Sequence, residues 1–198
     1  EFRTDTQHLA STILSALLTR FSPDLLPYHH HGLANNSFIG LHFRTEIDAI
    51  NVGYTSFEEQ TKAYLSFVSA TPIRAIYAAS GNTTSLSLFA VEAAKLDPPA
   101  TVVAKGDLLE GEDKQALEAL TWDQQALVDY LVLTKAARFA GVSDSSFSWG
   151  IAYARQVVSA EAGTCHSVGG LEEGVQFRDE LSTVFGRPRD WHINKLWP

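Results

Sequence analysis

The segment Phe38-Ile39-Gly40-Leu41-His42-Phe43, followed at once by Arg44-Thr45-Glu46, decides the fold prediction for this chain. Its first part is almost continuously apolar, which is typical of a strand buried on both faces of a parallel sheet. Charge begins abruptly at Arg44, where the strand should end. Three further short apolar runs have the same character and predict three more strands, at residues 73–79, 100–104 and 139–142.

Helical patterns separate these strands. Ser56 with Glu59 and Thr121 with Gln124 form capping-box patterns, which predict helices over 56–70 and 122–137. Further helices are expected over 5–20, 84–96 and from the serine cluster at 143–146 to about residue 158. Repeated alternation of strand and helix predicts an α/β fold, a doubly wound, mostly parallel, Rossmann-like sheet.

The length of 198 residues is compatible with one main domain. We expect an N-terminal helix and loop at 1–36, the Rossmann-like domain at 37–158, and a C-terminal tail at 159–198. The tail should contain one short helix near Gln176–Phe185, and residues 105–120 should be a loop with one or two helical turns.

Composition narrows the function classes. Lys and Arg number 15 against 23 Asp and Glu, a net charge of −8, so nucleic acid is not an expected partner. No apolar run is long enough to span a membrane. The single cysteine, Cys165, excludes an intrachain disulfide and a cysteine-rich zinc site, and we expect no metal. Cys165 is either a free thiol or the partner of a segment outside this chain.

Two glycosylation sequons, Asn35-Asn36-Ser37 and Asn82-Thr83-Thr84, favour the secretory pathway or secretion, although such triplets also arise by chance. The chain contains no methionine, which suggests a mature or trimmed product with a segment missing upstream.

Ligands of doubly wound sheets bind beyond the carboxyl ends of the strands. His42 and Arg44 follow the first predicted strand, Ser80-Gly81-Asn82 the second, and 143–148 the fourth, so the three segments should meet at one rim. A cation, a glycine turn and hydroxyls at a helix N-terminus suit a phosphate group. Each also has a purely structural interpretation: a surface ion pair, an ordinary turn, and helix capping.

Other motifs are weaker. No segment matches a P-loop, G-x-G-x-x-G or G-x-S-x-G, which leaves ATP, NAD and serine-hydrolase chemistry without support by those routes. The run His29-His30-His31 is expected to be a solvated loop rather than a metal site, and the adjacent Cys165-His166 poorly suits a catalytic pair.

Three segments together resemble the GDP-fucose protein O-fucosyltransferase family, most closely its fungal members. They are Phe38–Glu46, Ala126-Leu127-Val128-Asp129-Tyr130, and Phe139–Ser148 with its Gly141-Val142-Ser143-Asp144-Ser145-Ser146-Phe147-Ser148 sequence. The resemblance covers about residues 37–158 and implies the C-terminal, donor-binding domain of a GT-B glycosyltransferase. It implies GDP-fucose as donor substrate, no cofactor, and inverting transfer to a protein hydroxyl without an essential metal.

On that resemblance, Arg44 would act in catalysis by holding the β-phosphate and glycosidic oxygen. His42 and Asp129 would contact the nucleoside, and Ser145, Ser146 and Phe147 would hold the phosphates and the guanine side. The family often has an acidic residue after the second strand, where this chain has Ser80-Gly81-Asn82, so the ribose or base contact differs.

The family's N-terminal domain, which carries the acceptor site, would be a separate domain or chain. Glu46 and Asp48 are the nearest acidic residues that could replace a carboxylate from that domain. Two alternatives remain: a secreted binding or interaction domain that kept the fold without transferase activity, and an unrelated hydrolase that uses His42 and nearby acids.

Overall fold

The computed structural model describes residues 2–21, 37–161 and 172–187. Within them lies one mixed sheet with the strand order β3-β2-β1-β4-β6-β5. Its strands are β1 (Ile39–His42), β2 (Ala75–Ala79), β3 (Thr101–Val103), β4 (Arg138–Val142), β5 (Val175–Arg178) and β6 (Ser182–Phe185). Every neighbouring pair is parallel except β5 with β6. The predicted α/β, Rossmann-like, mostly parallel fold is therefore confirmed.

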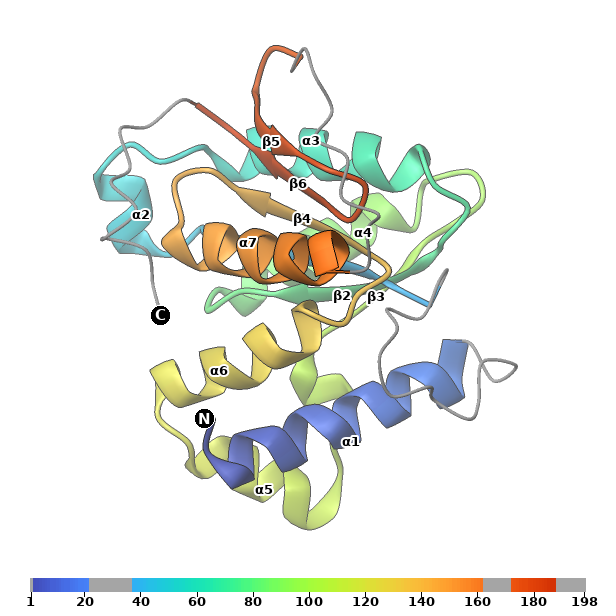
Figure 1. The fold of residues 1–198 in the computed structure, drawn as a ribbon, viewed down its shortest axis with the longest axis vertical. Coiled ribbons are helices and arrows are strands. Elements are labelled where there is room, and N and C mark those ends of the chain that lie inside the picture. Colours follow the sequence, from blue (N-terminus) through green and yellow to red (C-terminus); the bar gives the residue numbers. More distant parts are fainter. Residues whose placement is uncertain (1, 22–36, 162–171, 188–198) are drawn as a thin grey trace.

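Helices cover both faces of this sheet (Figure 1). The helices of the described residues are α1 (Thr4–Phe21), α2 (Ile47–Asn51), α3 (Phe57–Ser69), α4 (Thr83–Ala93), α5 (Gly111–Ala119), α6 (Trp122–Leu133) and α7 (Ser146–Glu161), with a 3₁₀ turn, η2, at Lys105–Asp107. Helices α3 and α4 lie on one face, and α6 and α7 on the other. Helix α1 packs against α6 on the side away from the sheet.

The pleat of each strand divides its side chains between two cores. Ile39 and Leu41 of β1 face the core with α3 and α4, together with Ile76 of β2. Tyr77 of β2 belongs to the opposite core, with α1, α6 and α7. Gly40 also faces that side, where a Cβ would lie 2.7 Å from Leu133 Cδ2, so glycine lets α6 approach β1 closely.

The expected helix near Gln176–Phe185 is wrong, because this segment contains strand β6 and most of β5. The Asp179 carboxylate accepts hydrogen bonds from the backbone N–H groups of Leu181 (2.9 Å) and Ser182 (2.7 Å), which closes a hairpin turn. Strand β6 then pairs with the open edge of β4 in the register Phe139↔Ser182. Val and Phe in β5 and Thr183-Val184-Phe185 in β6 are strand formers, so the local composition agrees with the observed strands and not with the expected helix.

Other differences are smaller. Residues 105–120, expected to be mainly loop, contain η2 and the nine-residue helix α5, and α2 was not predicted. The helix from Trp122 ends at Leu133 rather than at residue 137. The predictions for Asn35, His29-His30-His31, Cys165 and His166 lie outside the described residues. No helix in the described part of the chain is both long and apolar enough to cross a bilayer.

Candidate functional site

A cavity of about 340 Å³ opens at the carboxyl ends of the parallel strands. The chain builds β1, β2 and β3 in one direction and then crosses over to β4 on the other side of β1. The edge between β1 and β4 is thus the topological switch point, where doubly wound sheets bind ligands. In Figure 1 it lies on the left, beside α2 and the first turn of α7.

Every site residue predicted from the sequence lines this one cavity: His42, Arg44, Asp129, Ser145, Ser146 and Phe147. Ser80 and Gly81, from the turn after β2, line it as well. The expectation that three strand-end segments meet at one rim is therefore confirmed. The surface ion pair of the structural interpretation is present too, because Arg44 pairs with Glu46 and Asp48.

Arg44 lies at the mouth of the cavity and is held by two carboxylates. Its Nη1 donates to Glu46 Oε2 (2.5 Å) and Asp48 Oδ1 (3.0 Å), and its Nη2 donates to Asp48 Oδ2 (2.5 Å). Burial alone would lower the pKa of Arg44, but the hydrogen bonds with Asp48 and Glu46 outweigh it and raise that pKa. Arg44 is therefore both an ion-pair partner and a cavity residue.

The Glu46 carboxylate is fixed from two sides. Its second oxygen accepts hydrogen bonds from the Gly81 N–H (2.6 Å) and the Ser80 hydroxyl (3.2 Å). Burial tends to raise the pKa of Glu46, but the bonds from Arg44 and Gly81 lower it overall. A carboxylate stabilised in this way is a weak base, so Glu46 is better suited to orient Arg44 than to accept a proton.

His42 forms the inner wall. Its Nδ1 pairs with Ser148 Oγ (2.8 Å), and its ring lies 4.6 Å from the Phe147 ring, centroid to centroid. Since Ser148 Oγ accepts from the Val142 N–H (3.1 Å), its own proton can go to Nδ1, which leaves Nε2–H for a ligand. Burial lowers the pKa of His42 to about 4, so this imidazole is neutral at pH 7.

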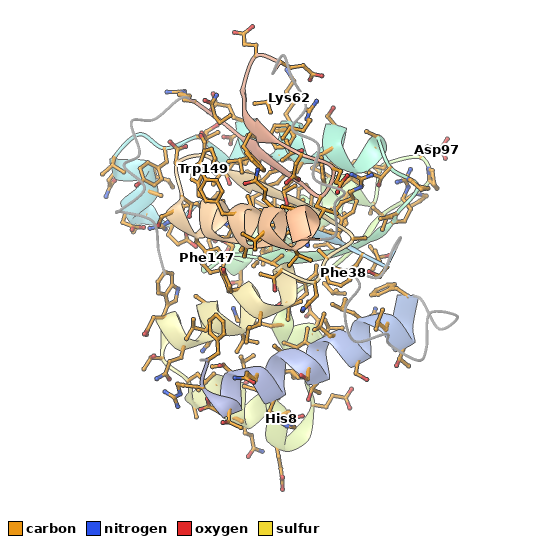
Figure 2. The ribbon with its side chains drawn as sticks, in the orientation of Figure 1. His8, Phe38, Lys62, Asp97, Phe147 and Trp149 are labelled. Atoms are coloured by element: carbon orange, nitrogen blue, oxygen red, sulfur yellow. The ribbon has the colours of Figure 1, made fainter. Side chains whose placement is uncertain are left out.

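The first turn of α7 forms the third side. Ser145, Ser146 and Phe147 precede or open this helix, whose first amides have no acceptors within the helix itself and carry the positive end of its dipole. Phe147 lies between α7 and α6, where its ring is 5.9 Å from that of Tyr130 (Figure 2). This helix N-terminus is suited to an anionic group.

Asp129 of α6 is buried at the floor and is not a free acceptor. It accepts hydrogen bonds from the Tyr77 hydroxyl (2.6 Å) and from Lys105 Nζ (2.5 Å). Burial, with the nearby Asp129 charge, raises the pKa of Tyr77 well above its ordinary value. A nucleoside contact by Asp129 would therefore use the lone pairs that Tyr77 and Lys105 leave open.

Among the cavity-lining residues that sequence reasoning did not select, Lys105 and Trp122 have the largest side chains. Lys105 follows β3 directly, so the strand-end rule that selected Arg44 would also have found it. Trp122, the first residue of α6, offered no such signal. The sequence analysis also did not select Ser148, whose hydroxyl pairs with His42 Nδ1, as a site residue.

Asn82 of the second sequon has a structural role. Its Oδ1 accepts from the Ser85 N–H (3.2 Å) at the start of α4, and its Nδ2 donates to the Thr45 carbonyl (3.1 Å). Nδ2 is the atom that an N-linked glycan would modify, and a glycan there would leave a single N–H to keep the bond to Thr45.

The geometry limits other chemistry at this edge. Ser148 is fully buried, and with a pKa near 4 His42 is a weak general base, so the two form a poor nucleophile–base pair. Across 2–21, 37–161 and 172–187, no three His, Cys, Asp or Glu side chains are grouped to hold a metal ion.

Neither the comparison with protein-family models nor that with curated proteins finds a match for this chain.

Proposed function

We propose that this chain is the donor-binding part of a glycosyltransferase of the GDP-fucose protein O-fucosyltransferase type. The observation that carries the proposal is the shared cavity. Residues from β1, α6 and α7, far apart in sequence, line one space at the switch point, and they are the residues to which the resemblance assigns donor binding. GDP-fucose would be bound as substrate, with a protein hydroxyl as acceptor.

Arg44 and the start of α7 would hold the diphosphate from opposite sides. In the transfer, the bond between the sugar C1 and the β-phosphate oxygen breaks, and its electron pair stays on GDP. The acceptor oxygen bonds to C1 from the opposite face, and its proton passes to a base that the resemblance places in a separate N-terminal domain. Arg44 and the helix amides would stabilise the charge that develops on the leaving diphosphate.

The ion pairs of Arg44 are compatible with this role. The Asp48 side chain is 66% exposed, so its attraction to Arg44 is weak and a phosphate can replace it at little cost. The more buried Glu46, anchored by Gly81, would keep hold of the guanidinium and orient it. Diphosphate binding would thus exchange one carboxylate partner of Arg44 and retain the other.

Calorimetric titration of GDP and GDP-fucose into the purified chain tests the proposal. The wild type should bind both, and Arg44→Ala should bind at least tenfold more weakly, because a charge-assisted bidentate contact is lost. Arg20→Ala, which removes the same charge from α1 away from the cavity, is the matched control and should bind like the wild type. A wild type that binds neither ligand, or an Arg44→Ala chain with unchanged affinity, contradicts the proposal.

One observation favours a second candidate, a binding or interaction domain. Ile47 and Ile50 of α2 and the following Val52 are 71%, 61% and 61% exposed beside Arg44, which is unusual for aliphatic side chains so close together. These side chains would bind a protein surface, whether or not sugar is transferred. Nucleotide affinity separates the two candidates, because only the transferase requires it.

A further inference from the structure

Trp122 combines two properties that seldom occur together. It is 65% exposed, although indole is a large and mainly apolar side chain, and it lines the cavity at the switch point. Its place at the start of α6 is defined by Thr121, whose N–H donates to Gln124 Oε1 (3.1 Å) and whose hydroxyl donates to Asp123 Oδ1 (2.6 Å). An exposed aromatic ring at the mouth of a cavity is available to stack on a ligand.

The turn after β2 shows at which end of the cavity the indole lies. A Cβ on Gly81 would be 2.8 Å from Trp122 Nε1 and 2.8 Å from Glu46 Oε1. Because Gly81 has no Cβ, both the indole Nε1 and this carboxylate oxygen can lie close to its Cα. Because Glu46 also binds Arg44 Nη1 (2.5 Å), Trp122 lies at the Arg44 end of the cavity.

The chemistry around the indole suits a sugar ring. A hexose has a face of C–H groups, which packs on an aromatic plane, and an edge of hydroxyls, which need hydrogen-bonding partners. Asp123 and Glu46 supply carboxylate oxygens beside the indole. Phosphate and sugar are directly bonded in a sugar diphosphate, whereas a nucleobase is separated from that phosphate by a second phosphate and a ribose. With Arg44 on the β-phosphate, a group next to Arg44 would be the sugar rather than the base, so the Gly81 turn would border the sugar in this chain and not the ribose or base.

We propose that Trp122 is the platform on which the sugar of a nucleoside diphosphate sugar stacks, and that it determines preference for the sugar-bearing donor over the bare nucleotide. This inference rests on the proposed function, because it takes Arg44 as the phosphate ligand. An indole face packed against the sugar would also stabilise positive charge on the sugar C1 as the bond to phosphate breaks.

The test compares GDP with GDP-fucose in the same calorimetric experiment, using wild type, Trp122→Ala and Trp122→Phe. Because Trp122 is largely exposed, its substitution should leave the fold intact, which far-UV circular dichroism checks. The wild type should bind GDP-fucose more tightly than GDP. Trp122→Ala should lose that preference, a loss of roughly three- to tenfold for GDP-fucose alone, and Trp122→Phe should keep most of it. Leu88→Ala, at an exposed position of α4 outside the cavity, is the control and should change neither affinity.

The outcomes separate this inference from the proposed function. Equal weakening of GDP and GDP-fucose in Trp122→Ala, or no change in either, overturns the sugar platform while Arg44-dependent GDP binding still stands. The same holds for a wild type that binds the two ligands equally. If the wild type binds neither ligand, both proposals are wrong.

Discussion

Two arginines at opposite edges of the sheet, Arg155 and Arg44, show how the same side chain serves structure in one place and a ligand site in the other. Arg155 of α7 is 1% exposed at the amino ends of the strands. It donates to the Ser182 hydroxyl and to the carbonyls of Leu133, Thr134, Ala137 and Leu181. Arg44, at the carboxyl ends, has a side chain that is 20% exposed, and it donates to Glu46 and Asp48.

The difference lies in what could replace the partners. The acceptors of Arg155 belong to the ends of α6 and the starts of β4 and β6, so these elements are joined through one guanidinium that water and ligands cannot reach. Burial lowers the pKa of Arg155 to about 9, and it remains charged at pH 7. Arg44 is held by anions at a cavity mouth, and another anion can take the place of one of them. Arg44 therefore differs from Arg155 in having charged partners that a ligand can replace.

The largest effect should come from Arg155→Met, which removes the buried guanidinium from the Ser182 hydroxyl and from four carbonyls. The carbonyls of Leu133 and Leu181 keep a backbone donor, whereas those of Thr134 and Ala137 lose the guanidinium. We expect the free energy of unfolding to fall by roughly 3–5 kcal/mol. The same substitution at Arg44, whose partners remain solvated or bonded to Gly81, should cost at most about 1 kcal/mol. Urea unfolding of the two variants measures both values. Equal losses would show that the comparison between the two edges is wrong.

The next effect concerns His42 and pH. Its native pKa is about 4, against about 6.5 in the unfolded chain, so the unfolded state binds more protons between these values. The contribution of His42 to the free energy of unfolding should therefore be fully present above pH 6.5. As the pH falls towards 4, the free energy of unfolding should decrease by roughly 3 kcal/mol. Urea unfolding across this range measures the slope. His42→Gln should flatten it. An unchanged slope in His42→Gln would rule out His42 as its source.

A smaller effect is expected at Gly141 of β4, behind the His42–Ser148 pair. An added Cβ would lie 2.6 Å from both Cβ and Oγ of Ser148, so Gly141→Ala should cost about 1–3 kcal/mol through overpacking. It should also weaken GDP binding, because Ser148 would move away from His42. Gly106→Ala, where the new methyl group meets nothing within 4 Å, is the control. Weakened stability with normal GDP binding would show that Ser148 does not position His42.

The smallest effect tests whether the partners of Arg44 are exchangeable. Asp48→Asn removes the competing charge at the exposed partner and should tighten GDP binding roughly two- to fivefold, with little change in stability. Glu46→Gln removes the anchored partner and should weaken GDP binding instead. Calorimetry distinguishes the two directions, and weaker binding in both variants would mean that Asp48 also helps to orient Arg44.

Much of the fold follows from local sequence. Short apolar runs predicted β1 to β4, and the capping box at Ser56 is present as expected, with the Glu59 N–H donating to Ser56 Oγ (3.2 Å) and the Ser56 N–H donating to Glu59 Oε2 (2.8 Å). The strand-end rule and the family resemblance together predicted six site residues, and all six line one cavity in the structure. These features depend on hydrophobic periodicity and chain direction, which neighbouring residues encode.

Tertiary structure decided the rest. The hairpin of β5 and β6 forms because β4 offers an open edge, which no pattern within residues 175–185 reveals. The pairing of Lys105 with Asp129, the two carboxylates on Arg44, and the meeting of Trp122 with Glu46 over Gly81 likewise depend on how α2, α4 and α6 meet the sheet. Sequence by itself determined where β1 to β4 end and which residues follow them, since apolar runs and turn residues are local patterns. Only the packed structure decided which charges meet there, because ion pairs form between side chains that are distant in the chain.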